Sequence, residues 1–172
     1  MSARQAAAPA PADLRRVLGR FLTGVTVLTA VDDGDVHGMT ANSFTSVSLE
    51  PPLVLVCLDP GARTAAAVER SRRVTISVLG AGHAATALRF ARRGGPRYPG
   101  PPPVPGADPP AVPDALAELR CTVEEVVVAG DHHVVLCRVR SAKARAGSPL
   151  GFFEGRFCDV VARDTPPVPP WY

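Results

Sequence analysis

Long apolar runs are missing from this 172-residue sequence, although 46% of its residues are hydrophobic. No window reaches the roughly 18 consecutive apolar residues that a membrane span needs. Residues 1–12 also lack the apolar segment of a signal peptide. From its length and composition we expect a single globular domain, cytoplasmic and without a membrane partner.

Metal-binding and disulfide motifs are missing as well. The four cysteines include no CxxC pair, and the four histidines share no zinc-ligand spacing with them. We therefore expect no metal site. Cys57, Cys121 and Cys137 fall in apolar or alternating runs, where a free thiol behaves as a small buried hydrophobic group. Disulfides are disfavoured in a reducing compartment.

Lysine is nearly absent, since Lys143 is the only lysine among 19 basic residues and the rest are arginine. The net charge of +3 is small. The arginines are interspersed with acids, without the basic stripe and interleaved aromatic residues that are typical of nucleic-acid binding. We expect a mixed-charge surface and no nucleic-acid partner.

Three segments have helical patterns. The first helix can be capped by Asp13 and is ended by Gly24. Its apolar residues with helical spacing are Leu14, Val17, Leu18 and Phe21. Thr64 could cap a second, short helix over 64–70. A third helix is expected over 83–93, and the residues that share one of its faces are Ala84, Ala87, Leu88 and Ala91.

The other periodic segments predict strands. Residues 25–31 are rich in β-branched side chains, and the turn at 32–35 leads into a return strand. The run 53–58 is apolar at every position, which predicts a strand buried on both faces. A strand is also expected at 74–79, followed by hairpins that turn at Gly130-Asp131 and Glu154-Gly155. This order indicates a closed antiparallel barrel with peripheral helices.

Proline marks the boundaries of the predicted domain. Nine of the 19 prolines lie between Pro96 and Pro113, so residues 94–113 predict a proline-rich surface loop. Residues 1–12 predict a disordered tail and residues 164–172 an extended tail, which leaves 13–163 as the domain. The sequence has no GxGxxG after a strand, no P-loop and no GxSxG elbow.

Seven blocks together resemble the short, split-barrel flavin reductases that serve as reductase components of two-component flavin monooxygenases. They are GVTVLTA (24–30), GMTANSFTSVSLEPPLVLVCL (38–58), Arg63-Thr64, SRRVTISVL (71–79), RFA (89–91), GDHHVVLCRV (130–139) and PLGFFEGRF (149–157). The resemblance implies a mainly β, FMN-binding split β-barrel, antiparallel and Greek-key-like, with a few peripheral helices. It also implies NAD(P)H-dependent reduction of FMN or FAD, which supplies reduced flavin to a separate monooxygenase.

The small side chains of residues 40–46 agree with this resemblance. A flat isoalloxazine ring can approach their backbone, whose N–H and C=O groups match the polar edge of the ring. Arg63 and a helix N-terminus suit a phosphate. The expected cofactor-binding residues are Thr40, Ala41, Asn42, Ser43, Thr45, Ser46, Ser48, Cys57, Leu58, Arg63, Thr64, Arg89, Phe90 and Phe153. The alternative is a polar edge strand over 40–46, a simple cap at Thr64 and a core role for Phe153.

His132 is the expected catalytic residue, because the resembled family has a histidine in this turn beside the nicotinamide. His133 replaces a small hydroxyl residue of the family, so either imidazole could face the nicotinamide. Ser77 stands where the family usually has asparagine, which could weaken a hydrogen bond to the cofactor or to a neighbouring loop. The proline-rich loop departs from the family pattern on the nicotinamide side.

Two further functions stay open at this point. One is a split-barrel oxidase that keeps its flavin and acts directly on an organic substrate, as pyridoxamine-phosphate oxidases do. The other is a flavin-binding module without turnover. Proteins that resemble this one close the flavin groove with a second subunit, so we expect a homodimer.

Overall fold

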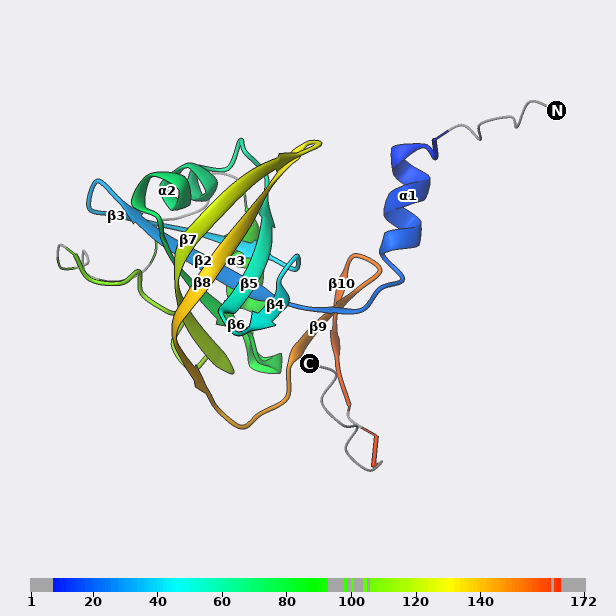
Figure 1. Cartoon of the computed structure of the whole chain (residues 1–172). Coiled ribbons are helices and arrows are strands. Elements are labelled where there is room, and N and C mark those ends of the chain that lie inside the picture. Colours follow the sequence, from blue (N-terminus) through cyan, green and yellow to red (C-terminus); the bar gives the residue numbers. More distant parts are fainter. Residues whose placement is uncertain are drawn as a thin grey trace.

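Two antiparallel sheets form the body of the computed structural model (Figure 1), which describes residues 8–92, 98, 100, 104, 106–161, 163 and 164. The larger sheet has the strand order β3-β2-β6-β7-β8-β5-β4, and the smaller has the order β1-β9-β10. The strands are β1 (Thr23–Gly24), β2 (Thr26–Asp32), β3 (Asp35–Ala41), β4 (Thr45–Leu49), β5 (Pro52–Leu58), β6 (Arg73–Val78), β7 (Ala117–Ala129), β8 (His132–Ala144), β9 (Leu150–Phe153) and β10 (Arg156–Asp159). The predicted mainly β, antiparallel architecture is confirmed. Residues 1–7 and 165–172, on which most of both predicted tails falls, lie outside the described residues.

Short hairpin turns explain how the sheets form from consecutive segments. The β2–β3 turn places Asp33 and Gly34 at φ of 49° and 79°, and the β9–β10 turn places Glu154 and Gly155 at 48° and 78°. Two positive φ angles in a two-residue loop give the backbone twist that matches paired strands. The β7–β8 hairpin turns at Gly130-Asp131, as its sequence predicts.

The helices are α1 (Pro11–Leu18), α2 (Arg63–Ser71) and α3 (Ala84–Ala91), with a 3₁₀ turn, η1 (Ala81–His83), before α3. Two capping predictions are wrong. Ala62, not Thr64, is the N-cap of α2, and Thr64 is buried inside the first turn. Likewise Ala10 precedes α1, so Asp13 lies in the first turn of that helix.

Of the four residues expected to share one face of α3, only Ala87 is fully buried. The helix buries Ala87 and Phe90, whereas Leu88 is 56% exposed. Phe90 packs on Gly38 of β3 so closely that a Cβ on Gly38 would lie 2.6 Å from the ring. This contact brings α3 against β3, and it depends on Gly38, which lies outside the sequence of α3.

The main core lies between the larger sheet and α2. Leu28, Val56, Ile76 and Val135 come from four strands and are at most 1% exposed. Ala65, Ala67 and Val68 of α2 pack among them. Small alanines let the helix approach the sheet closely, and α2 lies mainly against β2 and β3.

The larger sheet does not close into a continuous barrel. Its two edge strands, β3 and β4, are consecutive in the chain and are joined by residues 42–44. Residues 42–44 belong to no ladder of backbone hydrogen bonds within the part of the chain that is described. A β-bulge between Ser46 and Ser48 further interrupts β4. The opening of the barrel therefore lies at the segment that the sequence singles out.

Residues 106–116, here called the strap, differ from the predicted surface loop. Thr29 Oγ1 and Thr75 Oγ1 donate hydrogen bonds to the carbonyls of Pro110 and Pro109, at 2.7 and 2.6 Å. The backbone N–H of Val112 donates to Ser77 Oγ at 3.0 Å. These hydroxyls are buried in the sheet. The end of the proline-rich segment is therefore fastened across the sheet, and Ser77 bonds this loop.

The prediction that β5 is buried on both faces is wrong for the isolated chain. Val54, Val56 and Leu58 are buried, and the alternate residues Leu53, Leu55 and Cys57 are only partly covered. Directly opposite residues of antiparallel strands share a face, so Val134 and Leu136 of β8 and Val127 of β7 lie on this side too. We call this surface the outer patch: Leu53, Leu55, Cys57, Val127, Val134 and Leu136.

Candidate functional site

Residues 40–43, here called the cradle, are fixed by their own side chains to three different elements. Thr40 Oγ1 donates to the carbonyl of Ala87 in α3 at 2.7 Å. Asn42 Nδ2 donates to Thr23 Oγ1 of β1 at 3.2 Å. Ser43 Oγ lies 3.0 Å from both the N–H and the carbonyl of Cys57 in β5. The cradle is thus held rigidly at the opening of the barrel.

These contacts change the role of the cradle hydroxyls. Thr40 and Ser43 use them to hold the cradle in place, so their side chains do not reach for a ligand. What the cradle presents is backbone, beside the small side chain of Ala41. Ala41 ends β3, and its carbonyl accepts a hydrogen bond from Thr26 Oγ1 at 2.7 Å, so the backbone outside the strands is that of Asn42 and Ser43. Its N–H and C=O groups fit the alternating donors and acceptors of the flavin pyrimidine edge. The residues present therefore fit a flavin.

The GDHH turn and the cradle come together at one end of β5. Cys57 pairs with Val134, and Leu58 pairs with His133. His132 is exposed, and its Nδ1 lies 2.8 Å from Asp131 Oδ1. His133 Nδ1 lies 2.6 Å from Glu69 Oε1 of α2, on the opposite face of β8. The structure thus sends the two imidazoles to different sides of the sheet, with His132 on the side of the outer patch.

The remaining cofactor-binding residues predicted between positions 45 and 64 differ in how exposed their side chains are to solvent. Thr45 and Ser46 are exposed on β4, and Ser48 is half-buried at the bulge. Arg63 is exposed at the start of α2, five residues after β5 ends. Leu58, by contrast, is fully buried in the main core. Its side chain cannot contact a cofactor, so only its backbone could.

Three predicted residues lie on other elements. Phe90 is 8% exposed and packs on Gly38, so its ring belongs to the core. Arg89 stacks over that ring, with its guanidinium carbon 5.9 Å from the ring centroid. Phe153 is half-buried on β9. The residue before it on the same strand, Phe152, pairs with Thr23 of β1. Arg89 thus adjoins the α3 side of the cradle, and Phe153 belongs to the hairpin on its β1 side.

The charged groups near the site are tuned by hydrogen bonding. The imidazole of His132 beside Asp131 holds the pKa of that carboxyl below its usual range, with Arg15 a lesser contributor. Burial raises the pKa of the Cys121 and Cys137 thiols to about 12, so both stay protonated and inert.

The described residues contain no group of three metal-ligating side chains, and none of their helices is both long and apolar enough to cross a bilayer.

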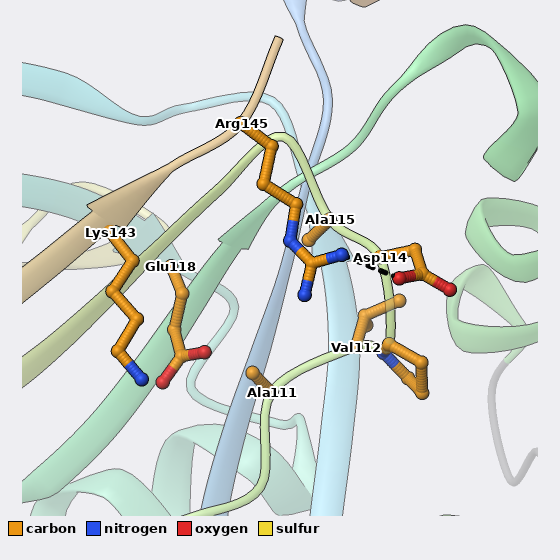
Figure 2. Close-up of a pocket in the computed structure, with 8 residues that line it drawn as sticks. Ala111, Val112, Asp114, Ala115, Glu118, Lys143 and Arg145 are labelled. Atoms are coloured by element: carbon orange, nitrogen blue, oxygen red, sulfur yellow. Dashed lines mark hydrogen bonds and ion pairs between the residues drawn. The ribbon is translucent and has the colours of Figure 1, made fainter. Parts of the chain in front are cut away.

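A pocket of about 210 Å³ lies apart from the cradle, between the strap and the ends of β7 and β8 (Figure 2). Arg145 Nη1 donates to Asp114 Oδ1 at 2.7 Å across it. Lys143 and Glu118 extend into it from directly opposite positions of β8 and β7. Glu118 already accepts a hydrogen bond from Arg120 Nε at 2.6 Å. Two of the charged groups that line the pocket, Arg145 and Asp114, are thus paired with each other, and Glu118 is paired with Arg120 outside it.

Sequence reasoning missed several residues that position the site. Thr23 and Ala87 hold the cradle, and Glu69 holds His133. Thr23 and Ala87 act through a hydroxyl and a backbone carbonyl in ordinary strand and helix positions, which carry no distinctive sequence signal. Glu69 could have been suspected, because it is the only acid in α2 and directly follows a run of small and apolar residues.

Comparison with known proteins places these observations in a family. Residues 18–161 match the family model described as a flavin reductase like domain. The chain is 37% identical over 150 residues to the reductase component of 4-nitrophenol 4-monooxygenase/4-nitrocatechol 2-monooxygenase from Rhodococcus opacus, covering 87% of this chain and 81% of the relative.

Solved structures give the same result. BorF, the flavin reductase component of a bacterial two-component tryptophan halogenase, has a TM-score of 0.81 at 36% identity, covering 90% of this chain and all of BorF. The NADH:FAD oxidoreductase SgcE6 of Streptomyces globisporus, in complex with NAD and FAD fragments, has a TM-score of 0.77 at 35% identity, covering 92% of this chain and 99% of SgcE6.

Proposed function

Because the chain belongs to the flavin reductase family and so catalyses NAD(P)H-dependent reduction of a flavin, we propose that NADH is its donor and that FMN or FAD binds at the cradle. The names of similar proteins support NADH, since SgcE6 is an NADH:FAD oxidoreductase. The reduced flavin then passes to a separate flavin-dependent oxygenase or related partner in the cytoplasm, a role consistent with the monooxygenase and halogenase systems of the relatives.

The observation that carries this proposal is the anchoring of the cradle. Its side chains bind α3, β1 and β5, and the backbone of Asn42 and Ser43, which belongs to no strand, stays available at the barrel opening. A site that is rigid before binding spends little free energy on ordering. The flavin, when bound, supplies the hydride acceptor and the nicotinamide supplies the hydride. The chain itself binds and orients the two rings, and no side chain needs to transfer a proton.

Assigned roles follow from position. The backbone of residues 41–43 holds the ring, and Thr45, Ser46 and Ser48 line the next part of the groove on β4. Arg63 at the start of α2 binds phosphate, aided by the helix N-terminus. Arg89 and Phe153 flank the groove from α3 and β9.

His132 positions the nicotinamide. Its imidazole is exposed on the side of the outer patch, at the same end of β5 as the cradle. Asp131 fixes one ring nitrogen and leaves the other free to meet the carboxamide. Stacking of two rings is sensitive to small displacements, so this contribution is to orientation.

A homodimer completes the proposed site. The outer patch is apolar and only partly covered, and its residue Cys57 is hydrogen-bonded to the cradle through Ser43. A strand that is apolar at every position indicates burial on both faces, which one chain does not provide for β5. A second copy on the outer patch would provide this cover and would place both flavin sites at the subunit interface.

The test is a steady-state assay in air with NADH or NADPH and with FMN or FAD added in excess. Nucleotide oxidation that depends on added flavin, faster with NADH, is the expected result. A flavin that stays bound through purification, with no turnover of added flavin, would instead favour the oxidase that acts on an organic substrate or the binding module without turnover. Adding such a substrate under air would separate those two.

A further inference from the structure

The β7–β8 hairpin ends in four exposed residues, 129–132, which we call the tip. β5 ends at Leu58, whose partner on β8 is His133. Beyond that row, no strand in the described part of the chain pairs with either side of the tip. Two strands without a third are only marginally stable in water. The tip, which carries His132, therefore does not fix its own direction.

The hydrogen bond of the His132 imidazole does not attach the tip to the body of the protein. His132 Nδ1 lies 2.8 Å from Oδ1 of Asp131, the preceding residue of the tip. The Asp131 side chain is itself 96% exposed. A bond between neighbouring residues orients the imidazole within the tip but leaves the tip free to move as a unit. The contact that places the tip therefore lies further along β8.

Glu69 of α2 makes such a contact with the next residue of β8. His133 Nδ1 lies 2.6 Å from Glu69 Oε1, and the His133 side chain is only 21% exposed. A hydrogen bond to a carboxylate is about twice as strong as one between neutral groups. The bond thus holds the inner side of β8 at the row where its third strand ends.

The end of α2 makes Glu69 a firm anchor. Arg70 binds Asp32 at the end of β2, with its Nε 3.0 Å from Asp32 Oδ1. Arg72, the C-cap of the helix, donates from Nη2 to two backbone carbonyls of β7 at 3.0 and 2.9 Å. This end of α2 is therefore tied to β2 and β7 independently of Glu69, and Glu69 does not move with the tip.

Rotation of β8 about its own axis would move both imidazoles, because neighbouring residues of a strand point to opposite faces. The cradle is close to this part of β8. Ser43 binds the backbone of Cys57, and Cys57 pairs with Val134. From Val134 to His132 the only intervening residue is His133. Holding the His133 side chain on the inner face therefore fixes where His132 lies on the outer face, relative to the cradle.

We propose that Glu69 is a positioning residue of the reductase: by holding His133 on the inner face of β8, it sets the direction in which His132 meets the nicotinamide on the outer face. This inference rests on the proposed role of His132 and adds the residue through which α2 controls it. Glu69 lies on the other side of the sheet from the nicotinamide, so it acts on hydride transfer only through the tip.

The first experiment needs no cofactor. ¹⁵N relaxation gives the backbone order parameters of the tip in wild type, Glu69→Ala and Glu69→Gln. Glu69→Ala removes the acceptor of the His133 bond, and the order parameters are expected to fall from near 0.85 toward about 0.6. Glu69→Gln keeps an acceptor oxygen and should remain near wild type. A tip that is already flexible in wild type, or one that is unchanged in Glu69→Ala, would overturn the proposal.

Arg70→Ala is the matched control. It removes the ion pair with Asp32 from the adjacent position of the same helix and leaves the contact with β8 in place. Urea denaturation measures the free energy of unfolding of both variants. Only Glu69→Ala should loosen the tip. If Arg70→Ala loosened it equally, Glu69 would act by general support of α2, and the positioning role would be wrong.

The second experiment follows hydride transfer by stopped-flow absorbance at saturating NADH and flavin. Glu69→Ala is expected to slow the transfer about three- to fivefold with an unchanged flavin dissociation constant, and Glu69→Gln should keep most of the wild-type rate. In the His132→Ala background, Glu69→Ala should have no further effect, because the group that it positions is gone. A further loss in that background, or weaker flavin binding in place of slower transfer, would overturn the proposal.

Failure of the proposed function would give a different result. A wild type that did not oxidise NADH with added flavin would contradict the proposed donor and the nicotinamide role of His132. The order parameters would still decide whether Glu69 holds the tip.

Discussion

The strap and the cradle are both irregular segments fixed by side-chain hydroxyls, and they differ in which partner supplies the hydroxyl. In the strap, hydroxyls of the sheet bind the backbone of the segment, as Thr75 binds Pro109. In the cradle, hydroxyls of the segment bind the backbone of its neighbours, as Ser43 binds Cys57. The strap therefore uses its backbone groups for folding. In the cradle the Ala41 carbonyl is also used, since it accepts a hydrogen bond from Thr26 Oγ1 at 2.7 Å, whereas the backbone of Asn42 and Ser43 lies outside every strand and is left for a ligand. Only the second arrangement makes a binding site.

The largest effect is expected from filling the cradle. In Ser43→Trp the two bonds of Ser43 Oγ to Cys57 are lost, and the indole pushes the cradle away from β5, where overpacking of this kind costs about 1–3 kcal/mol. Flavin affinity should fall roughly 10- to 100-fold while the circular dichroism spectrum is unchanged. Fluorescence titration with FMN and with FAD measures the flavin affinity of each protein. A folded Ser43→Trp protein with wild-type affinity would remove the cradle from the flavin site.

Detaching the strap should affect stability and leave flavin affinity nearly unchanged. Thr75→Val keeps the shape of the side chain but leaves the carbonyl of Pro109 without its buried donor, which costs about 1–3 kcal/mol. Urea denaturation measures the loss. Thr122→Val on β7 is the matched control, because Thr122 is partly exposed and should change stability little. If Thr75→Val and Thr122→Val lost the same free energy of unfolding, the hydrogen bond from Thr75 to the strap would not contribute to stability.

A smaller effect is expected from the two histidines. His132→Ala should slow hydride transfer about tenfold at saturating flavin, since a misplaced nicotinamide stacks poorly. His133→Ala should be milder, because its imidazole binds Glu69 on the other side of the sheet. Stopped-flow absorbance at matched NADH concentrations compares them. A damaging His133→Ala beside a silent His132→Ala would mean that the inner imidazole is the one that orients the nicotinamide.

The smallest effect concerns pH. The pKa of Asp131 lies below its ordinary value of 3.8 because His132 binds the carboxylate. A lowered pKa contributes stability that is present above the ordinary value and is lost as pH falls through the folded value. In His132→Ala the pKa of Asp131 should therefore move up toward 3.8, with almost no change in melting temperature because the group is exposed. NMR titration of the side-chain carboxyl carbon follows the shift, and an unchanged pKa would exclude the hydrogen bond.

The sequence was sufficient where local patterns decide the structure. Turn residues at Asp33-Gly34, Gly130-Asp131 and Glu154-Gly155 predicted three hairpins, and the family blocks predicted where the cradle lies. Tertiary contacts decided the rest. The face of α3 depends on the missing Cβ of Gly38, a residue 52 positions before Phe90. The strap depends on buried hydroxyls of β2 and β6, which in sequence look like ordinary strand residues.

The apolar pattern of β5 failed for a different reason. The run 53–58 predicts burial on both faces, and one chain buries only Val54, Val56 and Leu58. We interpret the mismatch as information about the assembly, because hydrophobic periodicity reflects every surface that a strand contacts in its working state. The site residues were harder to predict than the segment. A hydroxyl such as that of Ser43 looks the same in sequence whether it binds a ligand or a neighbouring strand.

The opening between β3 and β4 has a consequence for solubility. Because β3 and β4 do not pair with each other, the sheet keeps two unpaired edge strands. Unpaired edges are where β proteins pair with strands of other molecules and aggregate. Here β4 is five residues long and is broken by a bulge, and β3 is shielded by α3 through the contact of Phe90 with Gly38. An invading strand needs a straight run of several unpaired residues. The short, bulged β4 and the covered β3 leave little of such an edge on either side of the opening.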